Sequence, residues 1–152
     1  MINTSVAPSA LYNHAWVREL PRHHIQTLVK LAEEKQFRPG DVLYRQGEPA
    51  DRFYMIVSGT VELVLSWRTN AAAIGLTITA GDETGWCVLI KESVRRFTAK
   101  AMTSVRTLAF DGLELRAECD RDPRFGFILM KRFVYVVSER ADANRLQLLI
   151  RL

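Results

Sequence analysis

The sequence predicts an α+β fold that is mostly β: an antiparallel β-roll of the jelly-roll or double-stranded β-helix type. Apolar residues recur at helical spacing up to about residue 36, and from there they alternate in short runs separated by Gly turns. No proline follows Pro123, so the last thirty or so residues predict one long helix. We therefore expect a single domain in three parts: an N-terminal helical segment (1–36), the β-roll (37–111), and two C-terminal helices (112–152), the last one long.

Composition predicts a cytoplasmic protein without a membrane segment. Of the 152 residues, 48% are hydrophobic and 25% are charged, as in ordinary globular proteins. The net charge of +4 is spread along the chain, so it weakly favours anionic partners and does not indicate nucleic acid. Cys87 and Cys119 are far apart and match no metal-ligand spacing, so we expect two reduced, buried thiols.

The N-terminal segment predicts two helices. A short helix is expected over Ser9–Val17, and a longer one begins at Leu20 with an apolar stripe at helical spacing: Leu20, Ile25, Leu28, Val29 and Ala32. All three histidines, His14, His23 and His24, fall in this region. We expect them at solvated helix positions, and the alternative is a metal or haem role.

Six short strands follow the turn at Pro39-Gly40. They are expected at Val42–Tyr44, Phe53–Val57, Val61–Leu65, Ile74–Thr79, Arg96–Met102 and Val105–Phe110. Ser58-Gly59-Thr60 predicts a tight hairpin between the second and third strands.

The C-terminal segment predicts two helices and a dimer interface. Asp111 and Glu114 form a capping box for a short helix to about Cys119, and Pro123 occupies the favoured first position of the long helix. Apolar residues then step by four and three, as in a coiled coil, with one polar position that favours a defined register: Met130, Val134, Val137, Ala141, Asn144 and Leu148. This pattern predicts a homodimer through the C-terminal helix. The alternative is that the stripe packs only on its own domain.

The stretch Gly81–Ala101 has the composition of an anion-binding cradle. Gly85 allows close approach of the backbone, the turn after it offers amide groups, and Arg95 or Arg96 supplies a bidentate guanidinium.

Residues 37–63 (FRPGDVLYRQGEPADRFYMIVSGTVEL) resemble the opening of the cyclic nucleotide-binding domain. That β-roll is shared by catabolite-activator/FNR-type regulators, cyclic-nucleotide-dependent kinases and gated channels. The matching positions are Pro39-Gly40-Asp41, Gly47-Glu48, Asp51, Phe53-Tyr54, Ile56, Ser58-Gly59 and Val61. The resemblance extends from about Leu20 to the end of the chain, and it identifies residues 81–101 with the family's phosphate-binding cassette.

The resemblance implies a role for each cassette residue. Gly85 matches the cassette glycine, and Cys87-Val88-Leu89 stand at its Leu-Ala-Leu. Arg95 matches the phosphate-binding arginine of the family when Ala101 sets the register of the alignment, and Arg96 is the alternative. Only one of the two can face the ligand, because neighbouring residues on a strand face opposite sides.

Two positions depart from the family pattern. Trp86 replaces the glutamate that accepts the ribose 2′-hydroxyl, and an indole can only donate. Loss of a charged hydrogen bond weakens binding by about 10- to 150-fold, so cyclic AMP should bind weakly. Phe97 replaces a small alanine and, with Trp86, either narrows the cavity or offers a stacking face.

The resemblance implies a regulatory module that binds a small anionic, nucleotide-like ligand and signals through its C-terminal helix. The ligand-binding residues expected from it are Gly85, Trp86, Cys87, Val88, Arg95, Arg96 and Phe97. The alternative is a dimeric scaffold whose pocket is plugged by Trp86 and Phe97. We expect no enzyme, metal or cofactor, because all three histidines precede the roll. The chain stops at Leu152 without a DNA-binding domain, as expected for a stand-alone sensory module or a piece of a longer protein.

Overall fold

The computed structural model describes residues 8–66 and 74–150, without the side chains of residues 8, 74 and 144–150. It divides into two compact units, Met1–Leu115 and Arg116–Leu152, so the division falls within the first C-terminal helix instead of before it. The helical elements described in the first unit are α1 (Pro8–Tyr12), the 3-10 turn η1 (Ala15–Val17), α2 (Arg22–Leu31) and a second 3-10 turn, η2 (Trp86–Leu89). Its described strands are β1 (Ala32–Phe37), β2 (Val42–Tyr44), β3 (Arg52–Ser58), β4 (Val61–Leu65), β5 (Ile74–Ile78), β6 (Glu83–Thr84), β7 (Thr98–Ala101) and β8 (Val105–Asp111).

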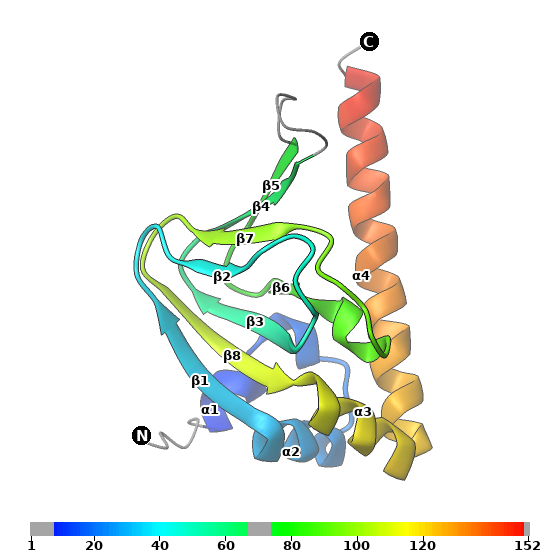
Figure 1. The fold of residues 1–152 in the computed structure, drawn as a ribbon. Coiled ribbons are helices and arrows are strands. Elements are labelled where there is room, and N and C mark those ends of the chain that lie inside the picture. The colour runs from blue at the N-terminus through cyan, green and yellow to red at the C-terminus, as the bar shows by residue number, and fades with distance from the viewer. Residues whose placement is uncertain (1–7, 67–73, 151–152) are drawn as a thin grey trace. The chain divides into compact units, whose positions relative to one another are not determined.

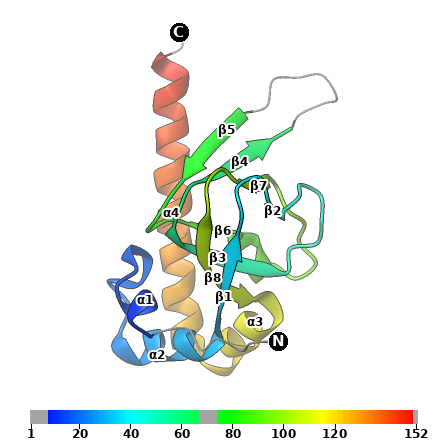
Figure 2. The same ribbon diagram turned by 90° about the vertical axis from the view of Figure 1, so that its left-hand side faces the viewer.

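The strands form two four-stranded antiparallel sheets, which confirms the predicted β-roll (Figures 1 and 2). One sheet has the order β1-β8-β3-β6 and the other β2-β7-β4-β5. Apolar side chains from both sheets meet in one cluster, which is the core of the roll: Tyr44, Tyr54, Ile56, Val61, Leu63, Ile78, Ala99, Ala101, Val105 and Ala109. The alternation seen in the sequence therefore places one side of each sheet in a shared interior.

The predicted hairpin at Ser58-Gly59-Thr60 is wrong, because β3 and β4 belong to different sheets. The turn carries the chain from one sheet to the other. Gly59 has φ +93°, and a Cβ there would clash with the Ser104 carbonyl, so the crossing needs glycine.

The helical segment is shorter than the predicted 1–36. Helix α2 ends at Leu31, and β1 pairs antiparallel with β8. Its sequence, AEEKQF, has little apolar character. The strand is instead held by backbone pairing and by ion pairs from its two glutamates, Glu33 to Arg52 at 2.8 Å and Glu34 to Arg106 at 2.9 Å.

Two of the three histidines are buried, which contradicts their expected exposure. His14 breaks the predicted first helix into α1 and η1, and its Nδ1 accepts a hydrogen bond from the Trp16 amide at 3.2 Å. Its Nε2 donates to the Ile56 carbonyl at 2.8 Å, so the ring ties the N-terminal helices to β3. His24 is buried on α2, and only His23 is exposed.

The second unit contains the helices predicted at the C-terminus, α3 (Gly112–Arg121), which straddles the division, and α4 (Pro123–Ile150). The carboxylate of Asp111 accepts hydrogen bonds from the first-turn amides of α3, at 2.8 and 3.1 Å. Asp122 caps α4 in the same way. Among the described residues, no helix has the length and apolar character needed to cross a bilayer.

Candidate functional site

Gly85 forms a left-handed turn that brings the chain against Arg95. The residue ends β6 with φ +89° and ψ 20° and caps η2. A Cβ at this position would lie 2.7 Å from the Arg52 carbonyl oxygen and 2.7 Å from Nη1 of Arg95. Glycine is therefore required twice, by the backbone conformation and by the close approach of a guanidinium.

Arg95 is held in place by a segment more than forty residues earlier in the chain. Its amide donates to the Glu48 carbonyl at 2.8 Å, and its carbonyl accepts from the Gly47 amide at 2.9 Å. Pro49 and Val94 form an isolated antiparallel bridge beside them. The Gly47-Glu48 turn therefore fixes the backbone from which the arginine side chain extends.

The guanidinium of Arg95 is buried, with only 2% of the residue exposed. One face of it stacks on the Tyr44 ring, 4.1 Å from the ring centroid. Its Nη2 donates to Oδ1 of Asp51 at 3.0 Å, and the Asp51 side chain is 73% exposed. Within the described residues, Nε and Nη1 have no hydrogen-bond partner. A buried cation with two unpaired donors is costly, and an anion with two acceptor oxygens would satisfy it.

Tyr44 links the arginine to the cassette strand. Its hydroxyl hydrogen-bonds the Thr84 hydroxyl, one residue before Gly85. Its ring also stacks on that of Tyr54 at 6.3 Å. Burial raises the pKa of Tyr54, and the charge of Arg95 opposes that rise in part. The phenol therefore stays neutral and adds no anion that would compete for Arg95.

The remaining cassette residues take different positions. Arg96 is exposed, so the structure turns Arg95 and not Arg96 inward. Cys87 and Val88 are buried, which leaves only their backbone for a ligand. Trp86 is half-buried, and Phe97 is 36% exposed, so Phe97 does not fill a closed cavity as a plug would.

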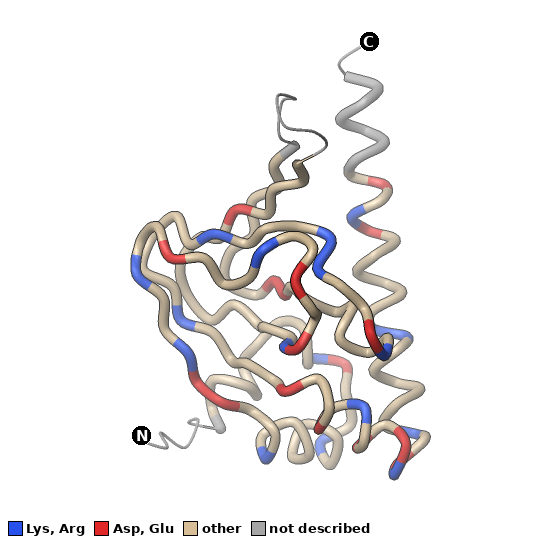
Figure 3. The backbone as a smooth tube through the Cα atoms, in the orientation of Figure 1, with Lys and Arg blue, Asp and Glu red and all other residues tan. Residues whose placement is uncertain are grey.

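Basic residues do not gather in one stretch of the described chain. Figure 3 shows Lys and Arg interspersed with Asp and Glu along the described chain. Attraction of an anion must therefore come from Arg95 itself. We call Arg95 and the residues around it the Arg95 site: Tyr44, Asp51, Gly85 and Arg95. In the described part of the chain, no group of three or more His, Cys, Asp or Glu side chains is placed to hold a metal ion.

The sequence singles out Gly85 and leaves Arg95 and Arg96 as alternatives, and it gives no ligand role to Tyr44 or Asp51. Tyr44 was assigned only to a strand. The sole signal for Asp51 was that it matched the family pattern next to the turn that fixes Arg95.

Comparisons with known proteins agree with this geometry. Residues 34–122 match the cyclic nucleotide-binding domain family. A protein of Rhodopseudomonas palustris, named as a proposed potassium channel protein, is 33% identical over 139 residues, 91% of this chain and 31% of that protein. The cAMP-dependent protein kinase regulatory subunit of Schizosaccharomyces pombe is 30% identical over 92 residues, 60% of this chain and 21% of the subunit. The chain thus spans a third or less of the length of these relatives.

A solved structure shows the same fold. The crystal structure of a proposed cyclic nucleotide-binding protein from Geobacter metallireducens GS-15 superposes with a TM-score of 0.78 at 24% identity, covering 90% of this chain and 98% of the other. Since the family match covers more than half of the 152 residues and includes both Gly85 and Arg95, this chain belongs to the cyclic nucleotide-binding domain family.

Proposed function

We propose that the protein is a regulatory module that binds a cyclic nucleotide or a closely similar small anion at the Arg95 site. The observation that carries the proposal is the buried guanidinium, whose Nε and Nη1 lack partners among the described residues. A guanidinium offers N–H donors in a plane, and the oxygens of a phosphate are acceptors that match them. The backbone after Gly85 supplies further donors on the same turn.

Thermal unfolding with a matched panel of ligands tests this proposal. Cyclic AMP, cyclic GMP and AMP carry a phosphate, whereas adenosine has the same base and sugar without charge. A bound ligand at a hundred times its Kd stabilises the folded state by about 2.7 kcal/mol, which raises Tm by roughly 5–10 °C for a chain of this size. We expect the rise with at least one phosphate-bearing ligand and not with adenosine.

The two neighbouring arginines provide the control. Arg95→Gln should abolish the rise in Tm, whereas Arg96→Gln removes the same charge from an exposed position and should preserve it. Equal responses in the two variants, or no response of the wild type to any nucleotide, would contradict the assignment of Arg95.

We also propose that the module is a homodimer through α4. Met130, Val134 and Val137 are exposed by 50%, 64% and 38% and follow the predicted stripe, as does exposed Ala141. The side chains of Asn144 and Leu148 lie outside the described residues. A ligand would signal through this helix only if it binds more tightly to one helix arrangement than to another.

Sedimentation of the wild type and of Val137→Asp tests the dimer. We expect a dimeric wild type and a monomeric variant, because a carboxylate would be buried in the seam. A wild-type monomer at micromolar concentration would remove the proposal, and it would leave the ligand-binding proposal untouched.

A further inference from the structure

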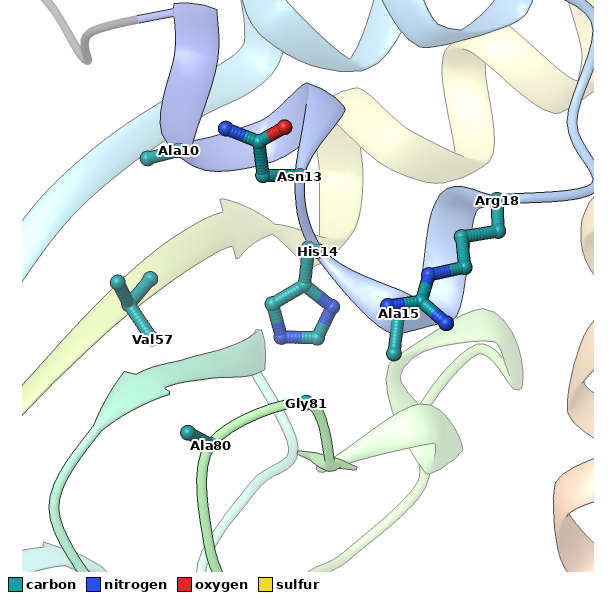
Figure 4. Close-up of a pocket in the computed structure, with 8 residues that line it drawn as sticks. All are labelled: Ala10, Asn13, His14, Ala15, Arg18, Val57, Ala80 and Gly81. Carbon is teal, nitrogen blue, oxygen red and sulfur yellow. The ribbon is translucent and has the colours of Figure 1, made fainter.

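A cavity lies between the N-terminal helices and the roll, and none of its lining residues belongs to the Arg95 site. Its volume is about 340 Å³, at the lower end of the range of roughly 300–1,000 Å³ that is typical of ligand pockets. Residues of α1, η1 and the loop between them line it together with the end of β3 and the turn before β6 (Figure 4): Ala10, Asn13, His14, Ala15, Arg18, Val57, Ala80 and Gly81.

Most of the lining is small and apolar, and one residue carries a charge. Alanine side chains and Val57 leave room where larger residues would fill the space. The His14 ring is a fixed wall, because one nitrogen donates to the Ile56 carbonyl and the other accepts from the Trp16 amide.

Arg18 is the one charged residue of the lining. No carboxylate of the described residues forms an ion pair with it, and no acidic residue lines the pocket. In Figure 4 its guanidinium turns back over Ala15 toward the His14 ring. A single cation beside an apolar hollow suits a ligand with one negative charge and an apolar body.

We propose that this pocket binds a small organic carboxylate. The carboxylate pairs with Arg18, assisted by the amide of Asn13, and a short apolar chain or ring packs against Ala10, Val57 and Ala80. Inorganic phosphate has the negative charge but no apolar group, so it fills the cavity poorly.

The pocket is connected to the cassette through one carbonyl group. The Ile56 oxygen accepts both the His14 Nε2–H at 2.8 Å and the Gly81 amide at 3.0 Å, and the Ile56 amide donates to the Asp82 carbonyl at 2.9 Å. The turn at Gly81 and Asp82 leads directly into β6 and Gly85. An occupant that contacts His14 and Gly81 shifts this turn only to the extent that it binds one position of the turn more tightly than another. If the proposed function holds, the occupant also changes affinity at the Arg95 site, and the coupling is reciprocal.

Titration of the full chain, followed by amide ¹H–¹⁵N NMR, tests the site with hexanoate, its neutral counterpart hexanamide, and inorganic phosphate. Hexanoate should shift the amides of Asn13, Ala15 and Gly81 in a saturable way. Hexanamide and phosphate should bind at least about tenfold more weakly, because each lacks one half of the recognition. If phosphate bound as tightly as hexanoate, the site would recognise only the negative charge, and the proposal would be overturned. The absence of any amide shift with hexanoate would also overturn it.

Variants separate this pocket from other cationic positions. Arg18→Gln should weaken hexanoate about tenfold or more, and Ala80→Phe should fill the cavity, whereas exposed Arg38→Gln removes the same charge elsewhere and should have no effect. Unchanged binding in Arg18→Gln refutes the site. Loss of the hexanoate shifts in Arg95→Gln would place the carboxylate at the Arg95 site and would also refute the proposed pocket. If the hexanoate shifts persist in Arg95→Gln, the proposed pocket stands even if no nucleotide binds.

Discussion

Replacing Arg95 with methionine should abolish anion binding and leave the free protein at least as stable as the wild type. The buried Nε and Nη1 have no partner among the described residues, and each unpaired donor costs about 1–3 kcal/mol. Methionine has a similar reach and no donor to satisfy. The variant loses the hydrogen bond to Asp51, whose exposed carboxylate makes the pair worth about 1 kcal/mol or less, and the stack on Tyr44, worth about 1 kcal/mol.

The balance favours the variant. If the two donors cost roughly 3 kcal/mol together and the lost contacts roughly 2 kcal/mol, the free energy of unfolding rises by about 1 kcal/mol. For a chain of this size the gain raises Tm by about 2–4 °C.

Urea unfolding followed by circular dichroism, with and without cyclic AMP, measures both effects. Arg96→Met is the matched control, because it removes the same charge at an exposed position and should change neither stability nor the response to the ligand. A loss of more than about 2 kcal/mol in Arg95→Met would refute the reasoning. It would mean that the arginine is a structural ion pair that is already satisfied in the free protein.

Four further outcomes are expected. In urea unfolding, Gly85→Ala should destabilise the chain by about 1–3 kcal/mol more than Gly47→Ala, because both residues have positive φ but a Cβ clashes only at Gly85. Equal losses of stability in the two variants would show that the Cβ clash at Gly85 costs nothing. Asp51→Asn should tighten phosphate-ester binding on the order of threefold at low salt in calorimetric titration, by removing a neighbouring negative charge, and weaker binding would contradict this. Cyclic AMP and its 2′-deoxy analogue should bind alike within about twofold, since the Trp86 indole cannot accept from the 2′-hydroxyl; a loss of about tenfold for the analogue would show another acceptor. Burial, with smaller effects of neighbouring acidic residues, raises the pKa of Cys119 to about 11. Alkylation of this thiol should therefore be slow at neutral pH and accelerate between about pH 9 and 11, where the contribution of the neutral thiol to the stability of the fold is also lost. Fast alkylation of Cys119 at pH 7 would contradict its burial.

Alternating apolar residues predicted most of the roll, because packing of two sheets needs one buried face on each strand. Strands β2 and β4 have the predicted bounds, and β3, β5 and β8 differ by a residue at one or both ends. Strand β1 could not be found this way, since AEEKQF owes its conformation to pairing with β8 and to ion pairs with Arg52 and Arg106. The burial of His14 was hidden for a similar reason, because its partner, the Ile56 carbonyl, is 42 residues away.

The choice between Arg95 and Arg96 depended on contacts that periodicity does not contain. Strand alternation does not apply there, because β7 begins only at Thr98. The direction of the side chain is set instead by two backbone hydrogen bonds: the Gly47 amide donates to the Arg95 carbonyl, and the Arg95 amide donates to the Glu48 carbonyl. The local pattern therefore predicted which residue types form the site, and long-range pairing decided which arginine faces inward.

The surroundings of Arg95 restrict the shape of the anion as well as its charge. Tyr44 covers one face of the guanidinium and Asp51 accepts from Nη2. Nε and Nη1, which point to different sides of the guanidinium, have no partner among the described residues. Nη1 also lies against Gly85, where a side chain would block it. An anion must therefore bring acceptor oxygens into the guanidinium plane, and the two free oxygens of a cyclic phosphate can supply them. With no acceptor on Trp86 for a sugar hydroxyl, the affinity of such a ligand rests mainly on its phosphate, and selectivity among bases must come from contacts other than Trp86.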